Sequence, residues 1–269
     1  MKTRIISGLV GTVALIAVML CPWRWVFVLA VAAAAGLATY ELVHNTGIVT
    51  NKWMILGSVT FAILQTLAIS LWAYGGVVLT VAPIVAYAIF TLFFFLILRK
   101  NVVWKGFGLT LYATIGFSAV GVLRSFPMLG LFYALLPMVI AWMSDTGAYF
   151  VGVFFGKHKM APVISPKKTW EGFVGGWLIS IGLTVLYGVI SNAVASGQVF
   201  DLAMLAVVAA VLAPLSVVGD LVASLIKRRV GIKDYGNIMP GHGGVMDRFD
   251  SVVFIAPLLL VAMMAVLMS

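Results

Sequence analysis

The sequence predicts an all-α membrane protein, a polytopic helical bundle of about nine transmembrane helices with a polar site facing the cytoplasm. Of its 269 residues, 63% are hydrophobic and only 9% are charged, whereas soluble domains carry about 25% charged residues. Apolar runs close to the ~20 residues that cross a hydrocarbon core recur along the chain, which leaves no room for a large soluble domain. We therefore expect one membrane domain, with N-terminal membrane helices over 1–125 and C-terminal membrane helices with cytoplasmic loops over 126–269.

Charged residues and turn residues divide the apolar runs into nine candidate helices. They cover residues 5–21, 25–41, 53–73, 77–98, 107–123, 128–155, 173–192, 202–226 and 251–268. The first two are short for a full crossing, and either can be tilted or partly embedded. The first run resembles a signal peptide, but no A-x-A-like site precedes a soluble part, so we expect a retained helix. Cys21 is the only cysteine, which excludes an internal disulfide and a multi-cysteine metal site.

The distribution of basic residues predicts which connections face the cytoplasm, because cytoplasmic loops hold the excess of Lys and Arg. The N-terminus and the connections after the second, fourth, sixth and eighth helices carry 15 of the 17 basic residues. The opposite connections hold only Arg24 and Arg124. We therefore expect a cytoplasmic N-terminus, an extracytoplasmic C-terminus, and a net charge of +9 that faces anionic headgroups and anionic metabolites.

The acidic residues need a further explanation, because seven of the eight fall on the cytoplasmic side and only Asp201 on the other. Asp145 lies within the apolar run "VIAWMSDTGAYFVG", and Asp220 lies about two turns before the eighth helix leaves the membrane. A carboxylate at such depth costs several kcal/mol unless it is paired, faces water or binds a cation. Pairing with a nearby lysine is the simpler explanation for either residue alone, and a shared site explains both.

Helical spacing adds detail around Asp220. Asp220, Ser224 and Lys227 follow i, i+4 and i+7, which aligns a carboxylate, a hydroxyl and an ammonium along one stripe. Asp247 and Asp250 stand at i and i+3 where the last helix starts, a position that favours carboxylates even when they only cap the helix.

These side chains fit the chemistry of a divalent cation with phosphates. Mg²⁺ is usually held by one or two carboxylates together with substrate phosphate oxygens, and Asp220 and Asp247 are the natural pair. The loop "PGHGG" at 240–244 can turn backbone N–H groups towards an anion before a helix N-terminus. Within it His242 either contacts phosphate, transfers a proton or merely hydrogen-bonds the loop. The loop "SPKKTWEG" at 165–172 supplies Lys167 and Lys168, which could equally face lipid headgroups.

The stretch from Ser224 to Asp250, "SLIKRRVGIKDYGNIMPGHGGVMDRFD", closely resembles the signature of phosphatidate cytidylyltransferases, also called CDP-diacylglycerol synthases. The pattern runs S-x-x-K-R-x4-K-D and then P-G-H-G-G-x2-D-R-x-D, with Met239 where the family more often has Leu, Ile or Phe. "SDTGAYFVG" from Ser144 and "SPKKTWEG" from Ser165 look like two further family motifs. The resemblance covers the C-terminal half, while the first ~125 residues match only as hydrophobic helices.

The resemblance implies the reaction of CTP with phosphatidate to give CDP-diacylglycerol and pyrophosphate for phospholipid biosynthesis, with a C-terminal catalytic region that depends on one or more Mg²⁺ ions. It implies Asp220 and Asp247 as metal ligands, which are also catalytic together with Lys227 and His242. The implied substrate-binding residues are Asp145, Lys167, Lys168, Ser224, Arg228, Lys233 and Arg248, and Asp234 and Asp250 would support the site. The implied partners are CTP, phosphatidate and bilayer lipid, without nucleic acid, and a homodimer is one option for assembly.

We expect the bacterial inner (plasma) membrane, with the active site facing the cytoplasm. Two alternatives stay open. One is a related CTP-dependent lipid transferase or polyprenol kinase. The other is a transporter of a phosphorylated anion, which would show internal repeats and charges at mid-depth on two related helices; no repeat is visible, and the charges gather at one face.

Overall fold

The computed structural model describes residues 2–21, 23–98, 101–238, 241 and 243–268, and these residues form nine α-helices. In chain order the elements are α1 (Lys2–Leu20), α2 (Arg24–Tyr40), the π-helical turn η1 (Glu41–Asn45), α3 (Lys52–Ser70), α4 (Trp72–Leu98), α5 (Asn101–Ser125), α6 (Gly130–Phe155), β1 (Lys159–Ala161), β2 (Ser165–Thr169), α7 (Trp170–Val194), α8 (Leu202–Arg229) and α9 (Met246–Met268). The nine predicted helices and the all-α fold class are confirmed. Several helices extend beyond the apolar runs, as where α5 begins at Asn101 and includes Lys105, because polar residues can continue a helix outside the hydrocarbon core.

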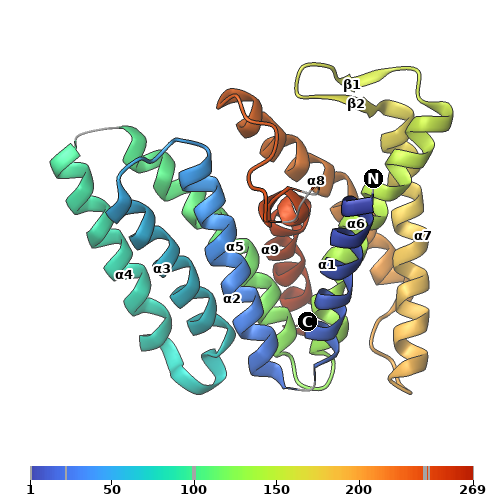
Figure 1. Ribbon diagram of the computed structural model, residues 1–269. Helices are drawn as coiled ribbons and strands as arrows, with labels where there is room; N and C mark the ends of the chain where they lie inside the picture. Colours follow the sequence, from blue (N-terminus) through green and yellow to red (C-terminus); the bar gives the residue numbers. More distant parts are fainter. Residues whose placement is uncertain (1, 22, 99–100, 239–240, 242, 269) are drawn as a thin grey trace. The chain divides into compact units, whose positions relative to one another are not determined.

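The chain divides into two compact units, and each is discontinuous in sequence. Unit 1 contains residues 1–125 and 229–249, and unit 2 contains residues 126–228 and 250–269. The glycine-rich stretch before α9 therefore belongs with the N-terminal helices, and the body of α9 belongs with α6, α7 and α8 (Figure 1).

Unit 1 is built around α3, which packs against α2, α4 and α5. The Ser58 hydroxyl in α3 hydrogen-bonds the Tyr87 hydroxyl in α4 at 2.9 Å, and the rings of Phe61 and Tyr87 stack with centroids 4.2 Å apart. The turn η1 continues α2 and contacts α3 and α5. Turns of π-helix insert one residue into the helical repeat and are frequent at functional sites.

Unit 2 is organised by the close packing of α6 and α7, helped by small side chains at every fourth position of α7. The buried members of this stripe are Gly172, Gly176, Ser180, Thr184 and Gly188. A β-carbon on Gly176 would collide with the carbonyl oxygen of Ser144 in α6, and Ser180 Oγ donates to the carbonyl of Ile140 at 2.9 Å. Small residues allow such close approach in membranes, where lipid supplies no hydrophobic drive between helices.

The remaining helices of unit 2 attach to this pair. Trp177 Nε1 in α7 donates to the carbonyl of Ala210 in α8 at 2.9 Å. Gly219 in α8 packs so closely on Phe254 of α9 that a β-carbon would lie 2.6 Å from its Cβ. This contact holds α8 and α9 together near the cytoplasmic end predicted for Asp220.

One element of unit 2 differs from the sequence prediction. Residues 165–172 were expected to form a loop, but β1 and β2 pair as an antiparallel hairpin with Lys159 opposite Thr169 and Ala161 opposite Ser165. Helix α7 then begins at Trp170 instead of residue 173, because Thr169 Oγ1 caps it by accepting from Gly172 N at 3.1 Å. Two short strands rich in lysine carry no apolar alternation that a sequence analysis can detect.

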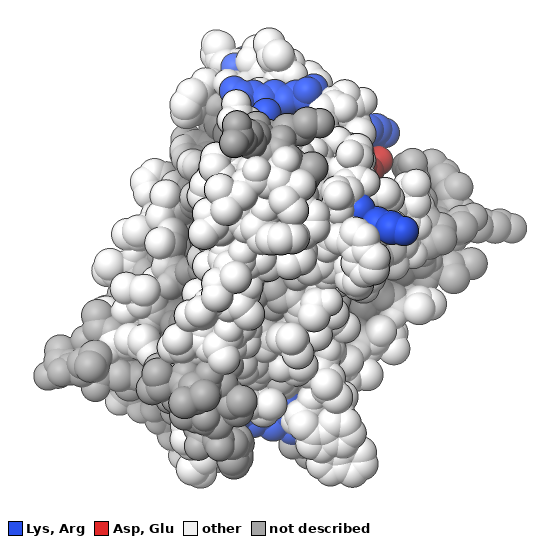
Figure 2. Space-filling view, turned by 90° about the vertical axis from the view of Figure 1, so that its left-hand side faces the viewer, with Lys and Arg blue, Asp and Glu red and all other residues white. Residues whose placement is uncertain are grey.

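The composition of the surface agrees with a membrane environment. Six helices in the described part of the chain are long and apolar enough to cross a bilayer, including the stretch Arg24–Asn45. Figure 2 shows a face on which most of the described side chains are uncharged. The protein is an integral membrane protein, and its second helix, continued by η1, is long enough for a full crossing.

Candidate active site

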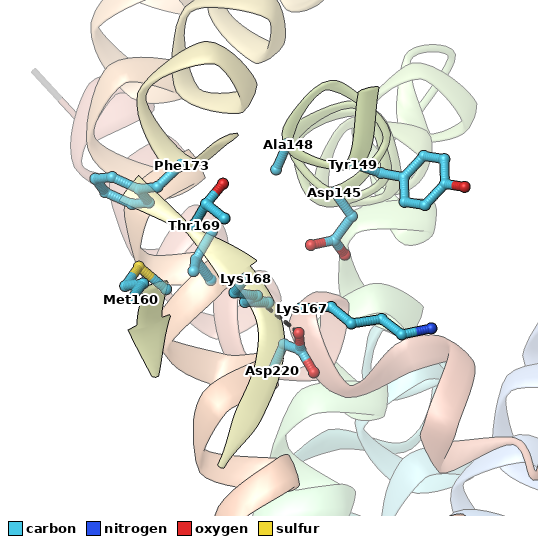
Figure 3. A pocket seen from close by; sticks show the side chains of 10 residues that line it. Asp145, Ala148, Tyr149, Met160, Lys167, Lys168, Thr169, Phe173 and Asp220 are labelled. Carbon is cyan, nitrogen blue, oxygen red and sulfur yellow. Dashed lines mark ion pairs between the residues drawn. The ribbon is translucent and has the colours of Figure 1, made fainter. Parts of the chain in front are cut away.

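A pocket of about 240 Å³ in unit 2 brings together four of the predicted site residues. Asp145 reaches it from α6, Lys167 and Lys168 from β2, and Asp220 from α8, while Tyr149 adds an aromatic wall (Figure 3). Helix–helix packing and the hairpin thus gather charges that lie 75 residues apart in sequence (145 to 220). The pocket offers both signs of charge beside apolar walls.

Asp220 lies at the centre of the polar contacts in this pocket. Its Oδ2 forms an ion pair with Lys168 Nζ at 2.6 Å. Its Oδ1 accepts a hydrogen bond from Ser224 Oγ at 3.3 Å. The stripe predicted from i, i+4 spacing is therefore present on α8. The side chains of Lys168 and Asp220 are 20% and 23% exposed, so solvent screening is reduced but not removed.

Asp250 and Lys227 extend the charged cluster behind the pocket. Both side chains are buried, and Asp250 interacts electrostatically with Asp220, Lys227 and Asp145. Ser251 Oγ lies 3.5 Å from Asp145 Oδ2, at the limit of a hydrogen bond. With Lys167, three carboxylates and three lysines lie in or beside the pocket, so a carboxylate here has both lysines and other carboxylates as neighbours.

The two adjacent lysines of the hairpin occupy different environments. Successive side chains of a strand point to opposite faces, so Lys168 turns towards Asp220 while Lys167 is exposed and its ammonium extends away from that pair (Figure 3). Arg228 at the end of α8 is exposed, and its Nε donates to the carbonyl of Ile164 in the hairpin turn at 3.3 Å.

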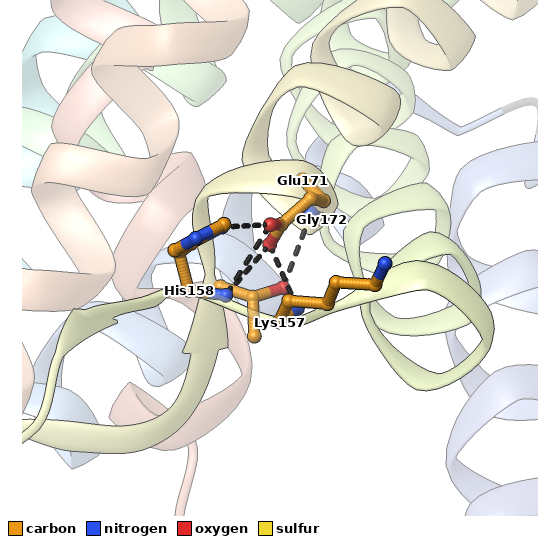
Figure 4. A network of polar contacts seen from close by, with 5 residues as sticks. Lys157, His158, Glu171 and Gly172 are labelled. Atoms are coloured by element: carbon orange, nitrogen blue, oxygen red, sulfur yellow. Dashed lines mark hydrogen bonds and ion pairs between the residues drawn. The ribbon is translucent and has the colours of Figure 1, made fainter.

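Glu171 fixes the base of this hairpin. Its carboxylate accepts hydrogen bonds from the backbone N–H groups of Lys157 and His158 and contacts the His158 ring (Figure 4). Trp170 N also donates to the His158 carbonyl at 3.0 Å. The strand β2, which carries Lys167 and Lys168, is therefore held at the point where the chain enters α7.

Unit 1 holds the other group of predicted residues, around Asp247. Asp247 Oδ2 accepts from Tyr235 N at 2.7 Å and from Gly244 N at 3.0 Å, so one carboxylate oxygen orders the glycine-rich loop. Gly243 has a φ of 86°, a left-handed conformation that glycine adopts without strain. The N–H of Gly244 donates to Asp247 in this structure, and the expectation that the loop turns its N–H groups to a bound anion stays a prediction.

The structure also identifies residues that sequence reasoning did not select. Glu41 and Asn45, both in η1, contact the loop: the Glu41 carboxylate accepts from Val245 N and Met246 N, and Asn45 Nδ2 donates to the Tyr235 carbonyl at 2.7 Å. The only signal in the sequence was an acid directly after the apolar run of α2.

The other predicted residues divide between the two units. Lys233, Asp234 and Arg248 are exposed in unit 1, whereas His242 lies outside the described residues. Asp220 belongs to unit 2 and Asp247 to unit 1, so the convergence of these two carboxylates stays a prediction.

The donor set of the pocket fits a hard divalent cation. Within the described residues, no three Asp, Glu, His or Cys side chains are grouped so that they could hold a metal ion by themselves. Such a cage is not required for Mg²⁺, which takes one or two carboxylates and completes its shell with water and phosphate oxygens. Asp220 borders the pocket and interacts with a further carboxylate, Asp250, so it suits this role.

The fold and the pocket define a class of protein: a polytopic membrane protein with a pocket that gathers carboxylates and lysines from its helices and its hairpin. Within that class, the chain belongs to the cytidylyltransferase family, whose model matches residues 2–266. It is similar to the phosphatidate cytidylyltransferases of Staphylococcus saprophyticus, with 43% identity over 150 residues (55% of this chain and 54% of the relative), and of Staphylococcus aureus strain COL, with 48% identity over 132 residues (48% of each). The chain thus spans about half the length of the curated relatives it matches.

Proposed function

We propose that the protein transfers the cytidylyl group of CTP to phosphatidate, giving CDP-diacylglycerol and pyrophosphate, at a site facing the cytoplasm of a bacterial inner membrane. The observation that carries the proposal is the Lys168–Asp220 pair in a pocket bordered by Asp145 and Lys167, in a membrane protein of the cytidylyltransferase family. The relatives named phosphatidate cytidylyltransferase support the choice of lipid acceptor.

The proposed chemistry is an in-line displacement at phosphorus. A phosphate oxygen of phosphatidate forms a bond to the α-phosphorus of CTP, and the bond from that phosphorus to the oxygen bridging to the β-phosphate breaks. Pyrophosphate leaves with that electron pair. A phosphate oxygen is already nucleophilic at neutral pH, so the protein needs no strong general base and acts by positioning and by charge stabilisation.

The pocket residues and the other predicted site residues would divide these tasks. Lys168 and Lys167 would contact the phosphates of CTP, and Lys227 would lower the repulsion between the two anionic substrates. Asp220 and Asp247 would hold Mg²⁺, which when bound supplies positive charge that stabilises the leaving pyrophosphate. The apolar walls of the pocket, Tyr149 and Phe173 among them, suit the region where an acyl-bearing substrate meets a soluble one.

The test separates this reaction from its alternatives by the position of a radioactive label. Purified protein in detergent is incubated with phosphatidate, Mg²⁺ and CTP labelled at either the α- or the γ-phosphorus. Cytidylyl transfer moves only the α-label into the lipid phase, whereas a kinase moves only the γ-label. Turnover in detergent without a transmembrane gradient also excludes a coupled transporter as the explanation. Absence of any lipid-soluble α-label would overturn the proposal.

A further inference from the structure

Glu41 is the most deeply buried acid of unit 1, with 0% of its surface exposed. A carboxylate in such a place costs several kcal/mol unless its oxygens are satisfied. Here Oε1 accepts from Val245 N at 3.0 Å and Oε2 from Met246 N at 2.8 Å. Because each oxygen accepts one N–H, the ionised carboxylate is the form that satisfies both donors.

The two donors lie where α9 begins. The first N–H groups of a helix have no partner within it and form the positive end of its dipole, which makes this position a natural binding place for an anion. In this protein the anion is a side chain supplied by a turn 204 residues earlier in the sequence. The beginning of α9 therefore holds an internal carboxylate at a position where helices commonly bind a phosphate.

Two glycines make room for this carboxylate. A β-carbon on Gly236 would lie 2.5 Å from Glu41 Oε1, and one on Gly244 would collide with the carboxyl group. Neither glycine is among the residues with positive φ, so backbone conformation does not require glycine at these positions. The close approach of the Glu41 carboxylate is what requires a residue without a β-carbon.

The contacts of Glu41 also set the surroundings of Asp247. Met246, whose N–H is bound by Glu41, directly precedes Asp247, and Asp247 Oδ2 holds Gly244 N and Tyr235 N. One turn further along η1, Asn45 binds the carbonyl of Tyr235. Thus η1 contacts the loop at Tyr235 through Asn45 and at Val245 and Met246 through Glu41. Asp247 joins the same two parts of the loop by binding Tyr235 N and Gly244 N.

We propose that Glu41 is a positioning residue of the reaction: its carboxylate occupies the N-terminus of α9 as a built-in anion and thereby fixes the orientation of Asp247. The proposal rests on the proposed function for its effect on turnover. Its structural part, an anion site filled by the protein's own side chain, is independent of the reaction.

The experiment empties the site and refills it from solution. Glu41→Ala leaves the N–H groups of Val245 and Met246 without their acceptor, and kcat should fall between about ten- and a hundredfold, as expected for a misplaced catalytic group. The apparent Mg²⁺ dependence should shift to higher concentration, while KM for CTP changes less. Added acetate or formate should restore part of the lost turnover. Glu41→Gln fills the site with one acceptor oxygen, so it should lose turnover without being rescued by acetate.

The control is Asp201→Ala, which removes another carboxylate that binds a helix N-terminus, since Asp201 Oδ1 accepts from Met204 N at 2.8 Å. Its activity should not respond to acetate. Rates of Glu41→Ala and Glu41→Gln equal to those of the unaltered protein would overturn the proposal, as would a loss in Glu41→Ala that acetate and formate leave unchanged. Should Glu41→Ala not fold, the rates and Mg²⁺ dependence of Glu41→Gln decide alone.

A second readout does not depend on activity. Acetate should raise the melting temperature of Glu41→Ala and leave that of the unaltered protein and of Asp201→Ala unchanged. If the unaltered protein makes no CDP-diacylglycerol, the proposed function fails, and the melting temperatures still test the anion site. Equal acetate effects on all three proteins would overturn that site.

Discussion

Lys167 and Lys168 show how much a single step along a strand changes the role of a side chain. Lys168 pairs with Asp220 and is 20% exposed, whereas Lys167 is exposed. We predict that Lys168→Ala lowers kcat/KM for CTP by roughly ten- to a hundredfold, the value of a lost hydrogen bond between charged groups of about 1.5 to 3 kcal/mol. Lys167→Ala should cost several-fold less. Steady-state kinetics of both variants check the prediction, and equal losses would contradict the assignment from strand alternation.

Asp220 is expected to be the most sensitive carboxylate of the pocket. Asp220→Asn keeps the size of the side chain but removes the charge that faces Lys168 and the proposed Mg²⁺. Turnover should fall by at least ~10²-fold, equivalent to about 2.7 kcal/mol of transition-state stabilisation. The measurement is CDP-diacylglycerol formation during a Mg²⁺ titration with variant protein that elutes as a single species. An unchanged rate and Mg²⁺ dependence would remove Asp220 from the metal site.

Local spacing accounts for the residues that sequence reasoning placed correctly. Asp220 and Ser224 are one helical turn apart, so the hydrogen bond between them follows from the period of the α-helix alone. Glu41 could not be found in this way, because its partners are 204 and 205 residues away. Contacts across such separations depend on which helices become neighbours, and helical periodicity does not contain that information.

At the level of elements, the α6–α7 contact offers a matched pair of glycines in one helix. A β-carbon on Gly176 would collide with the backbone of Ser144, whereas one on Gly182 would meet no atom within 4 Å. We predict that Gly176→Ala destabilises the protein by about 1 to 3 kcal/mol, the usual cost of overpacking. Gly182→Ala should be neutral or slightly stabilising, because alanine favours the helix. Thermal unfolding in one detergent compares the two, and equal melting temperatures would contradict this packing.

The hairpin provides a second test at this level. Glu171→Ala removes the acceptor of two backbone N–H groups at the base of the strands, and the lysines should then be held less firmly. We predict that KM for CTP rises several-fold while the melting temperature changes little, because the carboxylate lies at the exposed end of α7. A large drop in melting temperature with unchanged KM would show that Glu171 supports only the fold. The sequence did not predict this hairpin, since its strands are too short and too polar to show alternation.

For the whole molecule, the distribution of basic residues predicts sidedness. Six helices in the described chain are long and apolar enough to cross, and with 15 of 17 Lys and Arg in alternate connections we predict that all nine cross. An odd number of crossings then places the C-terminus outside the cytoplasm. Alkaline phosphatase fused after residue 269 should therefore be active. Activity of a cytoplasmic reporter at the same position would instead require one helix fewer or more to cross.

The interleaving of the two units has a consequence for biosynthesis. Residues 229–249 complete the first unit, and residues 250–269 complete the second, so neither can close until the ribosome has made nearly the whole chain. At 5–20 residues per second, the 205 residues between Glu41 and Met246 take roughly 10 to 40 s to translate. During that interval the Glu41 carboxylate has left the ribosome without the N–H groups that will later satisfy it. Its carboxylate must then be satisfied by water until the beginning of the last helix arrives.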